Sequence, residues 1–159
     1  GAASVGPMQL CRRKMIGGSA VLASVAAVPV LAQPQAKPKI VTYHDPGCGC
    51  CHKWAEHAKR AGFAVEVRSV SDIAAVKQRL GVPAELASCH TSVVGGYVVE
   101  GHVPLAAVQK LLKTRPKNVT GIAVPGMPRG SPGMEMPDGS KDAFSVIAFN
   151  RKGAVGRFA

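Results

Sequence analysis

The stretch Tyr43–Trp54, YHDPGCGCCHKW, holds three of the chain's five cysteines within four residues. The β-rich run Lys39–Tyr43 leads into it, residues 45–47 (DPG) form a typical turn sequence, and the residues from Trp54 onward favour a helix. The stretch therefore predicts a strand, a tight turn and a helix, with the sulfurs at the helix N-terminus. There the unpaired backbone N–H groups and the helix dipole favour thiolate over thiol.

Cys48 and Cys51 have the C-x-x-C spacing of thioredoxin-like redox sites and of many metal sites. Cys50 adds a sulfur between them, which dithiol exchange does not need. Three thiolates in so small a volume suit a soft metal ion, with Cu(I) and Zn as candidates. Structural disulfides are the remaining alternative, but adjacent cysteines pair only under strain and bridges within one turn would brace little of the chain.

Residues 1–32 are interpreted as upstream residues followed by a cleavable signal peptide, with Met8 as the start. Residues 12–14 (RRK) are positive, an apolar run extends from Met15 to Leu31, and small residues predict cleavage before Gln33. A membrane anchor is the alternative, but the run is short and contains Pro29. The paired arginines also resemble a twin-arginine export signal. We therefore expect a periplasmic protein with no permanent membrane span.

Cleavage there removes Cys11 and leaves four cysteines, Cys48, Cys50, Cys51 and Cys89. The leader carries three of the 20 basic residues, so its loss lowers the formal net charge from +11 to +8. The remaining Lys and Arg are scattered, without the aromatic platform or long basic run of an RNA-binding protein. The charge therefore indicates a solvated basic surface that attracts anions or acidic partners, and nucleic acid is not expected.

The mature chain predicts one α/β domain at residues 39–159, preceded by a linker at residues 33–38. Strands are expected at residues 39–43, 63–70, 92–94, 97–100 and 144–149, and helices at 51–61, 73–80 and 105–113. The order β-α-β-α-β-β-α is that of a thioredoxin-like fold, with a central mixed β-sheet flanked by helices. In this fold the loop before the third strand packs beside the C-x-x-C turn, so Cys89 is expected to come within reach of the other cysteines.

Residues 124–139 show no periodicity and hold three of the five methionines between prolines and glycines. A flexible loop whose methionines fill an apolar gap is the commoner use of Met. A thioether is also a good ligand for Cu(I), so Met127 and Met134 are candidate ligands. His44 and His90 stand next to the cysteine motifs and are expected either as ligands or as hydrogen-bond partners that orient a cysteine.

Four further residues near these motifs have simpler interpretations. Trp54 is expected to pack in the core, and His57 is expected on the surface. His102 is assigned to a strand end, and Glu135 to a solvated loop.

Four segments in order, YHDPGCGCCHKW (43–54), SCHT (88–91), GYVVEGHVP (96–104) and VPGMPRGSPGME (124–135), resemble the CopG-type copper-resistance proteins. The resemblance extends from about Lys39 to Phe149. These are periplasmic proteins of Gram-negative bacteria with a C-x-C-C motif. The resemblance implies a thioredoxin-like fold and copper binding, with a multinuclear, thiolate-bridged Cu(I) cluster as one form. The implied ligands are Cys48, Cys50, Cys51 and Cys89.

The leading hypothesis is a periplasmic copper-binding protein of copper resistance that sequesters or handles Cu(I), with copper ions and other periplasmic copper-handling proteins as its partners. The alternative is a thiol–disulfide oxidoreductase in which Cys48 attacks a substrate disulfide and Cys51 resolves the mixed disulfide. The two functions can also be combined, with electrons from these thiols reducing Cu(II). A zinc-stabilised structural module is a third class, but three cysteines within four residues strain a tetrahedral site. The sequence leaves open whether the protein turns over a substrate.

Overall fold

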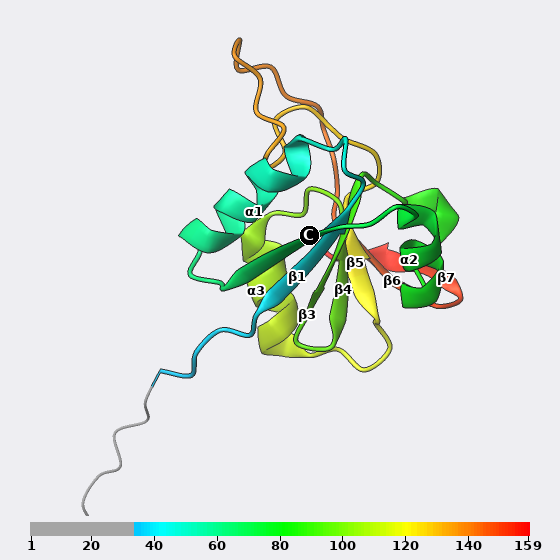
Figure 1. Cartoon of the computed structure of the whole chain (residues 1–159). Coiled ribbons are helices and arrows are strands. Elements are labelled where there is room, and N and C mark those ends of the chain that lie inside the picture. Colours follow the sequence, from blue (N-terminus) through cyan, green and yellow to red (C-terminus); the bar gives the residue numbers. More distant parts are fainter. Residues whose placement is uncertain (1–33) are drawn as a thin grey trace, which may run out of the picture. The chain divides into compact units, whose positions relative to one another are not determined.

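The computed structural model describes residues 34–159, so the predicted leader lies outside the described residues. Its centre is a seven-stranded mixed sheet in the order β2-β1-β3-β4-β5-β6-β7 (Figure 1). The strands are β1 (Ile40–His44), β2 (Val65–Ser69), β3 (His90–Val94), β4 (Tyr97–Glu100), β5 (Gly121–Ala123), β6 (Ile147–Asn150) and β7 (Gly153–Arg157). The helices are α1 (Cys50–Arg60), α2 (Ile73–Leu80), the 3₁₀ turn η1 (Ala84–Leu86) and α3 (Leu105–Thr114).

Helices cover both faces of the sheet. In Figure 1, α1 and α3 lie on one face and α2 lies on the other. The larger core cluster joins buried residues of α1 and α3, such as Trp54 and Leu111, to Ile122 of β5. The smaller cluster packs Leu86 against Phe149 of β6. The predicted α/β class, with a central mixed sheet flanked by helices, is confirmed.

The strand directions bring several connections to one edge of the sheet. β1 pairs with β2 in parallel and with β3 antiparallel, so the end of β1 at His44 lies opposite the start of β3 at His90. β4 runs antiparallel to β3, which places Glu100 opposite Thr91 at the same edge. The element order from β1 to α3 is compatible with a thioredoxin-like domain.

The turn between β1 and α1 is built as its sequence predicts. The backbone N–H of Cys48 donates to the carbonyl of Asp45 (3.0 Å), with Pro46 and Gly47 as the central residues. The Asp45 side chain also accepts from the Gly47 N–H (2.9 Å). This closed turn delivers the chain directly from the sheet edge into the first turn of α1.

Helix α1 is amphipathic, with buried residues at helical spacing, and it ends in a basic last turn that complements the helix dipole. The buried residues are Cys51, Trp54, Ala55 and Ala58. The spacing places Cys51 on the face that packs against the sheet, while Cys50 starts the helix at its partly exposed side.

Some boundaries differ from the sequence-based prediction. β3 starts two residues early, at His90, because its backbone pairs with β1 as far as His44. β5 was not predicted, since three residues are too short to show alternation, yet it pairs with both β4 and β6. The last predicted strand, 144–149, is shifted to Ile147–Asn150, and β7 completes the hairpin-like end.

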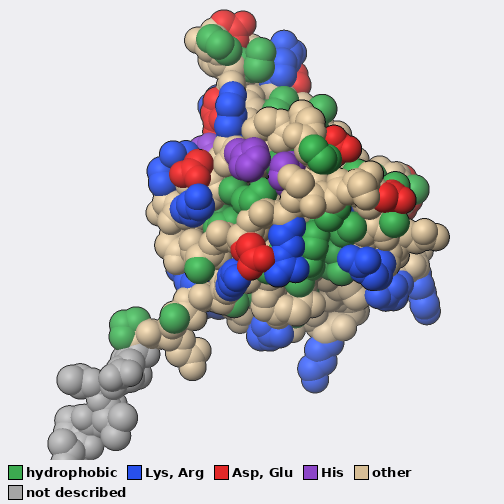
Figure 2. Space-filling model, viewed as in Figure 1, with side chains coloured by type: hydrophobic (Ala, Val, Ile, Leu, Met, Phe, Trp, Pro, Cys, Tyr) green, Lys and Arg blue, Asp and Glu red, His purple; other side chains and the backbone are tan. Residues whose placement is uncertain are grey.

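The described part of the chain carries more Lys and Arg than Asp and Glu. On the face shown in Figure 2, Lys and Arg side chains are spread over the surface rather than gathered into one patch. Between residues 34 and 159, none of the helices has both the length and the apolar character needed to cross a membrane.

Candidate metal centre

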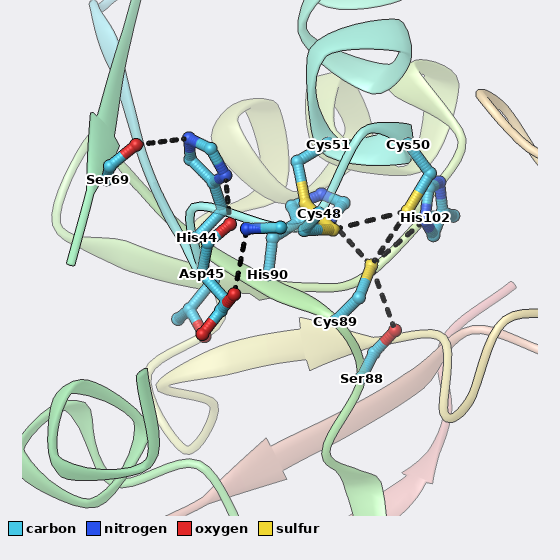
Figure 3. Close-up of a disulfide and its surroundings, with 12 residues drawn as sticks. His44, Asp45, Cys48, Cys50, Cys51, Ser69, Ser88, Cys89, His90 and His102 are labelled. Atoms are coloured by element: carbon cyan, nitrogen blue, oxygen red, sulfur yellow. Dashed lines mark hydrogen bonds between the residues drawn. A yellow bond between two sulfur atoms is a disulfide. The ribbon is translucent and has the colours of Figure 1, made fainter. Parts of the chain in front are cut away.

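Four sulfur atoms converge at the edge of the sheet where β1 leads into α1 and the chain enters β3 (Figure 3). The Sγ of Cys50 lies 3.3 Å from the Sγ of Cys48 and 3.6 Å from the Sγ of Cys89. Together with Cys51, all four sulfurs lie within 4.8 Å of one another. The fold therefore brings Cys89 to the C-x-C-C turn across 39 residues of sequence.

Cys48 and Cys51 are joined by a disulfide bond. Within residues 34–159, the free thiols are those of Cys50 and Cys89. The structure thus presents the C-x-x-C pair in its oxidised form, with two thiols beside it. Four thiolates become available only when two electrons reduce this disulfide.

Cys89 approaches the other sulfurs from the loop between η1 and β3. Burial, and after it the neighbouring Cys50, raise the pKa of its thiol to about 12. Cys89 is therefore a thiol in the metal-free protein. A metal ion that binds this sulfur must displace the proton.

Two buried imidazoles flank Cys89. Nδ1 of His90 and Nε2 of His102 each lie 3.1 Å from its Sγ. The two rings pack edge to face, with centroids 4.9 Å apart. Burial is the main cause that lowers the pKa of both His90 and His102, so both rings are neutral near pH 7. Neutral imidazoles are metal ligands.

The main chain fixes the tautomer of His102. Its Nδ1 lies 2.7 Å from the carbonyl oxygen of Pro132. Because a carbonyl only accepts, Nδ1 carries the proton and Nε2 offers a lone pair toward Cys89. The other ring shows a different signal: Nε2 of His90 is buried and has no hydrogen-bond partner among the described residues. A buried polar atom of this kind calls for a partner.

His44 occupies a different place from the other two histidines. Its Nδ1 contacts the carbonyl of Asp45 (2.7 Å), and its Nε2 contacts the hydroxyl of Ser69 (3.2 Å). Its ring packs edge-on against His52. In Figure 3 it lies on the opposite side of the sulfurs from His102. Both of its nitrogens are thus engaged in holding the end of β1.

The two methionines predicted as candidate ligands, Met127 and Met134, lie in different surroundings. Met134 is half-buried and lines a cavity of about 360 Å³ together with Cys50, Lys53 and a second thioether, that of Met136. Met127 is 52% exposed and does not line this cavity. The structure therefore places Met134 in the cavity that Cys50 lines, and Met127 outside that cavity.

Gly133 allows residues 124–139, the methionine segment, to approach α1. Its φ is +87°, and a Cβ at this position would lie 2.8 Å from the backbone N of Trp54 and 3.2 Å from Nδ1 of His102. Only glycine accommodates both the backbone conformation and the contact. The close approach sets the Pro132 carbonyl against His102.

Two further contacts tie this segment and α1 into the site. Glu135 accepts from the backbone N–H of Gly133 and pairs with Nε2 of His57 at 2.5 Å. His57 is partly exposed, as expected, but its role in holding the loop was not predicted. Trp54 is fully buried, as predicted, donates to the Val103 carbonyl (2.9 Å) and packs against the ring of His90.

His102 is the residue that sequence reasoning missed. The sequence assigns it to a strand end, although the predicted hairpin contains a signal for its place in the site. Cys89 precedes the first strand of that hairpin and His102 follows the second, so an antiparallel pair puts both at one edge. The pairing of Thr91 with Glu100 brings them together.

Comparison with known proteins now places the chain. Residues 86–134 match a family described as "Protein of unknown function, DUF411". Two solved structures, forms 1 and 2 of "Copper resistance protein copG", are 46% and 45% identical to this chain, with TM-scores of 0.71 and 0.72. Each match covers 77% of this chain, and 96% and 97% of those chains. The chain belongs to the CopG family. No curated protein sequence matches it.

The segment that matches the DUF411 family includes part of the metal centre described above. Cys89, both buried histidines and Met134 fall inside residues 86–134. The C-x-C-C turn lies N-terminal to this segment.

Proposed function

We propose that this chain is a copper-resistance protein of the periplasm that binds Cu(I) through its cysteine cluster. The observation that carries the proposal is the convergence of four sulfurs within 4.8 Å, with a neutral imidazole aimed at one of them. Thiolates are the donors that Cu(I) prefers, and imidazole also suits copper. The family relationship to a protein named for copper resistance supports the choice of metal.

Cys50 and Cys89 form the core of the proposed binding site, because they are free thiols 3.6 Å apart. His102 adds Nε2 and His90 adds a buried ring beside the same sulfur. Met134 supplies a thioether from the cavity next to Cys50. A cluster of several Cu(I) ions needs bridging thiolates, and such a cluster would use Cys48 and Cys51 after reduction of their disulfide.

The test is native mass spectrometry of the full chain, reduced and titrated anaerobically with Cu(I), beside the Cys50→Ser variant. We expect several copper ions to arrive together on the native chain and to be lost from the variant. One weakly held ion on both proteins would overturn the thiolate cluster. A matched control is His52→Gln, which changes an exposed residue of α1 outside the sulfur cluster.

A second candidate function is thiol–disulfide or copper redox chemistry, and the Cys48–Cys51 disulfide favours it. Two Cu(II) ions would take one electron each from the reduced pair, giving two Cu(I), the disulfide and two protons. Alternatively, Cys48 would attack a substrate disulfide and Cys51 would resolve the mixed disulfide. Cys50 discriminates between the hypotheses: exchange activity should survive Cys50→Ser, whereas a cluster should lose its metal.

A further inference from the structure

Glu100 ends β4 as a fully buried carboxylate close to the metal centre. One of its oxygens, Oε1, accepts from the backbone N–H of Ser88 at 2.7 Å and from the ammonium group of Lys77. The other, Oε2, accepts from the hydroxyl of Thr91 at 2.6 Å. No other fully buried carboxylate occurs in the described part of the chain. A buried charge of this kind requires such partners to persist.

The partners of Glu100 lie on both sides of Cys89. Ser88 is the residue before this cysteine, and Thr91 follows it by two residues. A single side chain therefore holds the chain at two points that bracket the sulfur ligand. Ser88 makes a second contact, because its hydroxyl donates to the carbonyl of Gly126.

Lys77 connects α2 to this arrangement. Its ammonium group contacts both the Glu100 carboxylate and, at 2.9 Å, the hydroxyl of Thr91. Its side chain is only 12% exposed, so the pair is largely withdrawn from solvent. The Lys77 charge compensates the buried carboxylate and allows it to remain an acceptor for the two groups that flank Cys89.

We propose that Glu100 is a positioning residue for Cys89 in the metal centre. It accepts hydrogen bonds from Ser88 and Thr91, which lie on either side of Cys89 in the chain. The inference rests on the proposed function, in which Cys89 is a copper ligand. Glu100 does not touch the sulfur. Its effect is to hold the η1–β3 loop so that Cys89 meets Cys50 and His102 without the loop having to rearrange around the metal.

Two neutral double variants separate hydrogen bonding from charge. Lys77→Met with Glu100→Gln keeps an amide oxygen that accepts from Ser88 and an amide N–H that donates to the Thr91 oxygen. Lys77→Met with Glu100→Leu has a similar volume but no polar group. Neither leaves an unpaired buried charge. Tyr97→Phe is the control, since it removes one hydrogen bond, to the Pro116 carbonyl, at the other end of β4.

Two measurements on the full chain report on Cys89. In the reduced, metal-free protein, iodoacetamide labelling of Cys89 relative to Cys50 is followed by peptide mass spectrometry. We expect the Leu variant to raise this ratio about tenfold, because the Ser88 N–H has lost its acceptor. Competition with a Cu(I) chelator gives the affinity, which should fall roughly 10–100-fold in the Leu variant. The Gln variant and Tyr97→Phe should match the native chain in both.

Equal behaviour of the Gln and Leu variants, when the native chain binds Cu(I), would overturn the positioning role and leave the proposed function intact. A native chain that binds no Cu(I) would overturn the proposed function, while the labelling ratio would still test the position of Cys89. Should circular dichroism show the Leu variant to be unfolded, Thr91→Val removes one of the two flanking bonds in an isosteric way. An unchanged labelling ratio in that variant would also reject the inference.

Discussion

Nε2 of His102 lies 3.1 Å from Sγ of Cys89, and the carbonyl of Pro132 holds the opposite nitrogen of the same ring. This arrangement joins three segments that are remote in sequence: the loop before β3, the end of β4 and the methionine segment. In the metal-free protein, the Cys89 thiol donates to this lone pair. A metal ion that replaces the proton would find both atoms already in place.

Replacing His102 should therefore weaken copper binding. We expect His102→Gln to reduce Cu(I) affinity at least by the roughly tenfold loss that follows from removing an outer partner of a metal ligand. The measurement is chelator competition under anaerobic conditions, with His52→Gln as an exposed control. Equal affinity of His102→Gln and the native chain would show that the imidazole neither binds the metal nor orients Cys89 for it.

Reduction of the Cys48–Cys51 disulfide should change the copper capacity of the protein. Without reductant, alkylation is expected at Cys50 and Cys89, with Cys48 and Cys51 still linked. After reduction, all four should be alkylated, and native mass spectrometry should show more Cu(I) per chain. The same copper number before and after reduction would mean that the C-x-x-C pair does not contribute ligands.

Gly133→Ala should lift the methionine segment from α1. The added Cβ would lie 2.8 Å from the backbone N of Trp54. The positive φ would add about 1–3 kcal/mol of backbone strain. Gly139→Ala is a matched control, because Gly139 has a φ of +74° and open space around its Cβ position. We expect both variants to lower the melting temperature and only Gly133→Ala to lower Cu(I) affinity. Equal affinities in the two variants would contradict a role for this contact.

Asp142, which follows the methionine segment, bonds back to Arg129 within it. Its carboxylate accepts from Nη2 (2.7 Å), Nε (3.0 Å) and the backbone N–H (2.9 Å) of that arginine. These bonds lower the pKa of Asp142 below its ordinary value of 3.8, so the tie is present at neutral pH and is lost only as the pH falls through the lowered pKa.

Asp142→Asn should loosen this tie at neutral pH. Limited proteolysis is expected to cut the variant faster within residues 124–146, while β1 and α1 stay protected. Asp138→Asn serves as the comparison, because the side chain of Asp138 contacts its own turn at Ser140. Similar cleavage of both variants would show that the Arg129 contact does not restrain the segment.

Much of the fold could be predicted from local patterns. The turn at Asp45 and the Asp72 cap of α2 follow from side chains that bond to neighbouring backbone groups, so a short window of sequence contains the cause. β5 could not be predicted in this way, because Gly121–Ala123 is a strand only through its pairing with β4 and β6. Position 121 also requires glycine, because a Cβ there would lie 2.5 Å from the Phe149 ring.

The metal centre could be predicted only in part, because some of its residues are brought together by long-range pairing and burial. The cysteine motif is local, and its spacing alone indicates soft-metal or redox chemistry. The contribution of His102 depends on the register of the β3–β4 hairpin, and that of Glu100 depends on burial. Met127 and Met134 look equivalent in sequence, and only the course of the loop around Gly133 separates them.

The sulfurs of Cys50 and Cys89, separated by 39 residues, come together only in the folded chain. An unfolded chain would hold copper through the C-x-C-C turn alone, with lower affinity. Copper at a concentration 1,000 times its dissociation constant would then stabilise the folded state by up to about 4 kcal/mol. Because proteases act on opened chains, the lifetime of this protein would lengthen as the copper supply rises.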